Sequence, residues 1–104
     1  MFDMTENDVV MVYQCLKGEY DLVLTNTSLL DAGFTIDTPI IVGKAHGQEI
    51  WLYVCEEIFI IDVMNTDHTA GTHWHPYDID AAVKDMADFM NGKSDYEMES
   101  FPKA

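Results

Sequence analysis

Between residues 35 and 64, β-branched and aromatic runs alternate with short turn-forming stretches, and no other feature limits the fold as strongly. The runs are residues 39–42, 49–55 and 58–64, separated by residues 43–47 and by Glu56 and Glu57. Valine, isoleucine and aromatic residues favour strands, whereas glycine and clusters of polar residues favour the connections between them. The alternation predicts an antiparallel meander.

Both faces of the predicted sheet are apolar. Successive side chains of a strand point to opposite faces. In residues 49–55 one face carries Ile50, Leu52 and Val54, and the other carries Trp51, Tyr53 and Cys55. In residues 58–64, Ile58 and Ile60 likewise oppose Phe59, Ile61 and Val63. One face can pack against helices, and the other needs a cover, a partner or a ligand.

Helical patterns flank the meander. Thr5 can cap a helix over residues 5–17, with Asp8 completing a capping box and Gly18 ending the helix. Near the other end of the chain Asp78 can cap a second helix, and Asp80 lies at its positive end. Its apolar stripe consists of Ile79, Val83, Met86, Phe89 and Met90, and Gly92 is placed to end it.

Two segments are less regular. Residues 26–28 can cap one or two helical turns through Leu29, Leu30 and Ala32, so a short helix is the preferred interpretation, and a strand at residues 20–25 is the alternative. Residues 93–104 form a polar, acidic tail that either docks on the domain or frays.

The length of 104 residues suits a single domain, residues 1–104. We therefore predict an α+β fold in which an antiparallel sheet of three to four strands packs against an N-terminal and a C-terminal helix. Cys15 and Cys55 are far apart in the chain, which predicts two reduced, partly buried thiols.

The charge is strongly negative, with nineteen Asp and Glu against five Lys and no Arg, and the formal net charge is −14. Such a field repels phosphate backbones and anionic lipids and attracts basic surfaces, so we expect neither nucleic-acid nor membrane binding. The chain lacks both a signal-peptide pattern and an apolar run of roughly 18 residues, which predicts a cytoplasmic protein.

Three of the four histidines lie within residues 68–75. If residues 72–76 are extended, His73 and His75 project from one face, and with His68 and Asp67 they offer donors for a transition metal. The alternatives are that these histidines shape a turn by hydrogen bonding, or that they form a pH-sensitive surface. The sequence contains no recognisable nucleophile or paired-carboxylate motif, so we predict no catalytic residues and no cofactor.

A partner surface is the other interpretation of this region. Trp51 and Tyr53 share a sheet face, Trp74 lies beyond the meander, and Asp78 and Asp80 follow it. Tryptophan and tyrosine are enriched at the energetic centres of interfaces, and flanking carboxylates suit a basic protein. These five residues are the predicted binding set.

The chain also resembles the small, acidic immunity proteins of bacterial polymorphic-toxin systems. The resemblance is in general character and covers most of the chain: a helix, a meander containing Ile50-Trp51-Leu52-Tyr53, and Thr72-His73-Trp74-His75-Pro76 leading into an amphipathic helix. It implies a non-enzymatic inhibitor that occupies the basic active site of a toxin, and it transfers no individual residue role.

Three functional hypotheses follow. The first is a non-enzymatic, protein-binding module of immunity type whose acidic surface masks a basic partner. The second is a metal-binding protein or small metal-dependent hydrolase that uses His68, His73 and His75. The third is a homodimer formed through the second apolar face of the sheet.

Overall fold

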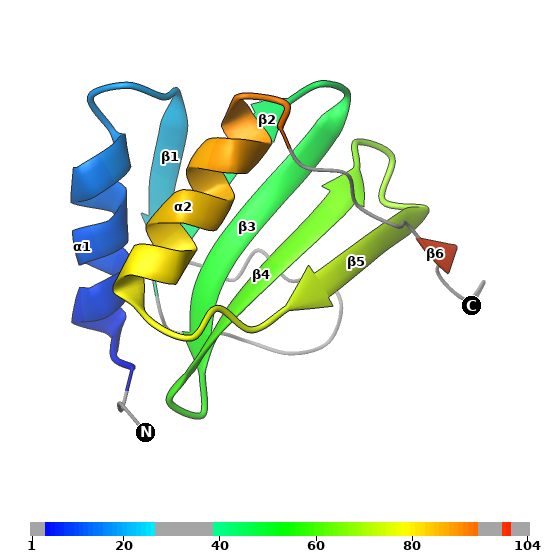
Figure 1. Cartoon of the computed structure of the whole chain (residues 1–104). Coiled ribbons are helices and arrows are strands. Elements are labelled where there is room, and N and C mark those ends of the chain that lie inside the picture. Colours follow the sequence, from blue (N-terminus) through cyan, green and yellow to red (C-terminus); the bar gives the residue numbers. More distant parts are fainter. Residues whose placement is uncertain (1–3, 27–38, 94–98, 101–104) are drawn as a thin grey trace.

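The computed structural model describes residues 4–26, 39–93 and 99–100. Within them the chain forms helices α1 (Glu6–Leu16) and α2 (Ile79–Met90). The strands are β1 (Leu22–Asn26), β2 (Pro39–Ala45), β3 (Gln48–Cys55), β4 (Ile58–Asn65), β5 (Ala70–Trp74) and β6 (Glu99–Ser100). They pair antiparallel in chain order as one sheet (Figure 1).

The α+β class, the antiparallel meander and the two flanking helices are confirmed, but the predicted number of three to four strands is wrong. The described sheet has five strands of five to eight residues and a sixth, β6, of two residues. The extra strands lie on both sides of the predicted meander. β1 pairs with β2, and β5 pairs with β4. Each extra strand forms by pairing with an edge of the predicted meander, β1 across a long connection and β5 across a short turn, and such pairing is not contained in the pattern of the strand itself.

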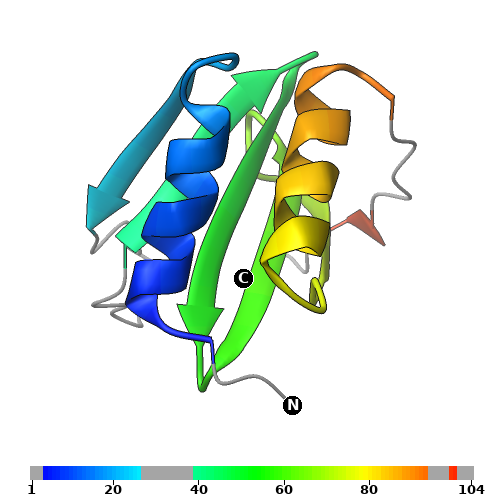
Figure 2. The same ribbon diagram turned by 60° about the vertical axis from the view of Figure 1, so that its left-hand side comes forward.

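Both helices lie side by side on one face of the sheet (Figures 1 and 2). The sheet residues beneath them continue across the strands in register, from Ile41 to Leu52, Ile61 and Trp74. The helices contribute Val9, Val12, Leu16, Ala82, Met86 and Phe89 to the same core. Burial of these apolar side chains between helices and sheet is the main source of stability for such a layered fold.

The predicted helix boundaries are confirmed to within one residue. The Thr5 amide donates to Oδ2 of Asp8 at 2.7 Å, as the capping box requires. At α2, Oδ1 of Asp78 accepts the amide of Ala81 at 2.8 Å. Gly92 follows the C-cap with φ of 70°, a left-handed conformation that favours glycine.

The turn between β2 and β3 is tighter than the sequence pattern indicates, whereas the turn at Glu56 and Glu57 has the predicted length. β2 continues to Ala45, so only His46 and Gly47 connect it to β3, and only Glu56 and Glu57 connect β3 to β4. All four residues have positive φ, between 52° and 73°. Two-residue loops of this kind match the right-handed twist of the paired strands.

The structure describes part of each of the two less regular segments. Residues 22–26 are strand β1, as the alternative interpretation has it, whereas the preferred short helix through Leu29, Leu30 and Ala32 lies outside the described residues. Of the tail, residues 99–100 pair with Ala70 and Gly71, and residues 94–98 and 101–104 also lie outside the described part.

The predicted burial of the thiols is wrong. Cys15 and Cys55 are free and exposed. Cys15 lies outside the buried stripe of α1, and Cys55 ends β3 beside the hairpin turn, where the sheet gives little cover. Among the described residues no helix has the length and apolarity needed to cross a membrane.

Candidate functional site

The sheet face opposite the helices, termed the second face, combines apolar and ionisable side chains. One row runs across the strands from Val23 to Val42, Trp51, Asp62 and His73. Beside it, a small buried cluster consists of Ile40 and Tyr53, against which Val42, Trp51 and Ile60 pack. Neither α1 nor α2 covers this face (Figure 2). The face is apolar toward β1 and polar toward β5.

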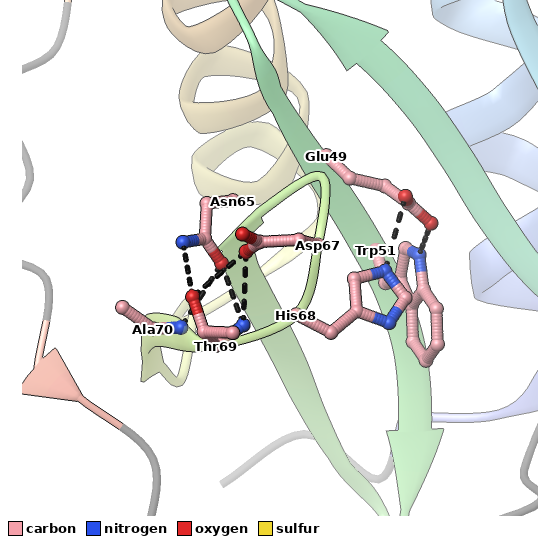
Figure 3. A network of polar contacts seen from close by, with 7 residues as sticks. All are labelled: Glu49, Trp51, Asn65, Asp67, His68, Thr69 and Ala70. Carbon is pink, nitrogen blue, oxygen red and sulfur yellow. Dashed lines mark hydrogen bonds and ion pairs between the residues drawn. The ribbon is translucent and has the colours of Figure 1, made fainter.

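Glu49 anchors a first polar contact on this face (Figure 3). Its side chain is only 10% exposed, yet it carries a carboxyl group. Nε1 of Trp51 donates to Oε1 of Glu49 at 2.6 Å, and Nε2 of His68 lies 3.3 Å from Oε2. A carboxylate only accepts hydrogen bonds, so the His68 nitrogen must carry a proton to bond with it. These two donors offset part of the cost of burying the acid.

The turn between β4 and β5 positions His68 (Figure 3). Oδ1 of Asn65 accepts the Thr69 amide at 2.9 Å, and Oδ1 of Asp67 accepts the Thr69 hydroxyl at 2.7 Å. The hydrogen bonds from Thr69 lower the pKa of Asp67. His68 itself has φ of 60°, and its ring meets that of Trp51 edge to face at 6.0 Å between centroids.

Asp62 forms a second polar contact. The Tyr53 hydroxyl donates to Oδ2 of Asp62 at 2.9 Å. Burial raises the pKa of Asp62, while the Tyr53 hydrogen bond and the nearby His73 and His75 act in the opposite direction. Burial, reinforced by the Asp62 charge, raises the pKa of the Tyr53 hydroxyl as well. The tyrosine therefore stays a neutral donor at physiological pH.

We predict that Asp62→Asn stabilises the protein increasingly as the pH rises. An acid with a raised native pKa binds its proton more tightly in the native state, so its contribution to the free energy of unfolding falls as the pH rises above the ordinary value of 3.8. Asparagine keeps the shape and an acceptor for Tyr53 but removes this dependence. Urea unfolding at a series of pH values between about 4 and 7 measures the difference.

The matched control is Asp21→Asn, which removes the same charge from an exposed position before β1. It corrects for the general repulsion within a chain of net charge −14. If the free energy of unfolding rises by the same amount in both variants at every pH, a specific effect of burial at Asp62 is contradicted.

The predicted partner-binding residues divide between two places. Trp51 and Tyr53 lie together on the second face. Trp74 instead packs against the core on the helix side, and its Nε1 donates to Oδ2 of Asp85 in α2 at 2.8 Å. Asp78 caps α2, and Asp80 is exposed in its first turn. The structure thus brings two of the five residues together on the second face.

The predicted metal ligands are also separated. His68 pairs with Glu49, and Asp67 bonds within its own turn. The rings of His73 and His75 lie near each other, 5.9 Å apart between centroids. Within residues 4–26, 39–93 and 99–100, no three His, Cys, Asp or Glu side chains are arranged to hold a metal ion.

Glu49 was not among the candidate site residues predicted from the sequence. The period of two along a strand places Glu49, Trp51 and Tyr53 on one face, so the signal was present in the alternation. The resulting arrangement of an indole and a phenol beside two held carboxylates is suited to binding. Comparison of the chain with models of protein families, with curated proteins and with solved structures found no match.

Proposed function

We propose that this protein is a protein-binding module whose second face docks on a basic surface of a partner. One observation carries the proposal: half-buried Trp51 packs on the small apolar cluster of Ile40 and Tyr53, with Glu49 bonded to its indole and Asp62 across from it on β4. An aromatic anchor surrounded by polar groups is the usual composition of an energetic centre in an interface.

The carboxylates are already oriented before any partner arrives. Trp51 and His68 hold Glu49, and Tyr53 holds Asp62. Fixing these side chains in advance lowers the entropy lost on association. In the inhibitory form of the proposal, the half-buried Asp62 pairs with a lysine or arginine side chain of the partner's active site, in the place of a phosphate group, while the buried Glu49 holds Trp51 and His68 in position.

The charge of the chain favours a basic partner over a second copy. Two copies, each with a formal net charge of −14, repel each other as they approach. The same field accelerates encounter with a basic protein. Light scattering is expected to report a monomer at low salt, and a dimer under that condition would favour self-association through the second face.

Binding to a basic protein is expected to depend on both salt and Trp51. With lysozyme as a small basic probe, the dissociation constant should rise about tenfold or more between about 50 and 300 mM salt. Trp51→Ala should weaken binding by about tenfold as well, the loss typical of an interface anchor. Amide chemical shifts of the ¹⁵N-labelled chain should change most on β3 and β4.

Met11→Ala is the control, since Met11 is an exposed apolar residue of α1 on the opposite side of the sheet. It should leave the affinity for lysozyme unchanged. Equal losses for the two variants would argue against the second face as the docking surface. Binding that does not respond to salt would remove the electrostatic part of the proposal.

A further inference from the structure

A groove lies at the end of the sheet formed by the β3–β4 turn. Two cavities of about 410 and 220 Å³ make it up, and both are lined by Met4 and Glu57. Three separate segments meet there: the start of α1, the β3–β4 hairpin, and the connection from β5 to α2. The backbone joins two of them, since the Met4 amide donates to the Glu57 carbonyl at 3.2 Å.

The larger cavity has an apolar base and an acidic rim. Met4 and Val54 are buried and supply the apolar surface. Glu6, Glu56 and Glu57 supply the acidic rim. Among the described residues none of these three carboxylates has a hydrogen-bond or ion-pair partner.

The net field in this cavity favours a cation. The amino end of α1 lies in the lining and contributes roughly half a positive charge. Three carboxylates outweigh it several-fold. Because they come from two elements, they can surround a compact ammonium group, which has no planar geometry to match, better than they can align with a guanidinium fork.

The smaller cavity adds an apolar contact. Its lining includes Ile58, Phe59, Pro76 and Tyr77. Ile58 is 40% exposed and Tyr77 is 75% exposed, so two large side chains face solvent beside the acidic rim. An exposed aromatic residue next to these carboxylates is suited to a segment that carries both a positive charge and an apolar side chain.

The hairpin turn adds a supporting argument. Glu56 and Glu57 have φ of 52° and 67°, in the left-handed region where asparagine and glycine are strongly preferred. Two glutamates here reduce stability relative to Asn-Gly. Backbone strain retained at such a site is consistent with a role for the side chains themselves.

We propose that this groove binds a lysine of a partner's extended segment, followed by an apolar residue. The lysine stem lies along Met4 and Val54, and its ammonium group lies among Glu6, Glu56 and Glu57. The following apolar side chain packs against Ile58 and Tyr77. The site goes beyond the docking surface on the second face, and either surface can bind without the other.

The test uses a short blocked peptide that contains one lysine followed by leucine, titrated into the ¹⁵N-labelled full chain at low salt. Shifts are expected at residues of the β3–β4 turn and at Tyr77. Two peptide controls separate charge from length: acetyl-lysine keeps the stem without the charge, and diaminopropionic acid keeps the charge on a shorter stem. Both should bind at least about fivefold more weakly.

The variant test replaces the two turn glutamates by glutamine, Glu56→Gln with Glu57→Gln. Its control, Glu19→Gln with Asp21→Asn, removes the same two charges from exposed positions remote from the groove. Binding should weaken about fivefold in the first double variant and less than twofold in the second. Equal weakening in both, or tight binding of the acetyl-lysine peptide, would overturn the proposal.

A second pair of substitutions tests whether any loss of peptide binding is caused by unfolding. Glu56→Asn with Glu57→Gly gives the turn its preferred residues and removes the same two charges. The melting temperature of this variant should rise, while its binding of the lysine peptide should be lost. Unimpaired peptide binding by this more stable variant would also overturn the site, and Trp51→Ala should leave the peptide affinity unchanged.

Discussion

Phe59→Ala is expected to lower the free energy of unfolding by about 3–5 kcal/mol. Phe59 is fully buried on the helix side of β4, where it pairs with Val54 across the strands. Removing the ring leaves a cavity under the helices that the close-packed core cannot fill completely. Since small domains are stable by only about 5–15 kcal/mol, urea unfolding should show a large shift of the midpoint.

Its neighbour Ile58 is the matched control. Ile58 precedes Phe59 in the same strand but points to the other face and is 40% exposed. Ile58→Ala should cost about 1 kcal/mol or less, because surface truncations away from the core have small effects. Comparable losses at the two positions would contradict the assignment of the faces of β4.

Gly43→Val should destabilise the fold by about 1–3 kcal/mol through overpacking. A Cβ atom at Gly43 would lie 2.6 Å from Cδ2 of Leu22 and 3.1 Å from both Cγ2 of Ile50 and Sδ of Met90. These atoms belong to β1, β3 and α2, so three elements must adjust together. The absence of a side chain at Gly43 therefore allows α2 to approach the sheet. Thermal and urea unfolding both measure the loss.

Gly18→Ala provides the comparison for that result. An added Cβ at Gly18 meets no atom within 4 Å. Alanine there should leave stability unchanged or raise it by about 0.4–1 kcal/mol, by restricting the unfolded chain. If Gly18→Ala lowers the stability as much as Gly43→Val does, replacing glycine has a general cost and the packing explanation is wrong.

The sequence predicted the parts of the fold whose signals are local. α2 follows from its cap at Asp78, its apolar stripe and Gly92, which lie within one short window. The alternation in β3 correctly placed Trp51 and Tyr53 together on one face. The length of the β2–β3 turn was overestimated because glycine is common in loops, whereas in the structure Gly43 is a position of β2 against which the side chains of Leu22 and Met90 pack.

Features that depend on register or on distant pairing were not predictable in this way. Trp74 lies on the helix side because it pairs with Ile61, which fixes the face it presents. β1 forms because β2 offers it an edge, and the local pattern at residues 19–34 was compatible with either helix or strand. The groove at the β3–β4 turn gathers residues from three segments, so no single window of sequence contains it.

The order of the strands also determines how the chain can reach this structure. Each strand from β1 to β6 pairs with the next one along the chain. From β2 to β5 the connections are two to four residues long, so each pairing closes a small loop at little cost in chain entropy. The sheet can therefore form by successive growth from the β3–β4 hairpin, whereas the packing of α1 and α2 on each other and on β2 and β3 joins segments far apart in the chain, so we expect it to follow. We expect the hairpins to form rapidly and the long-range packing of the helices on the sheet to limit the rate of folding.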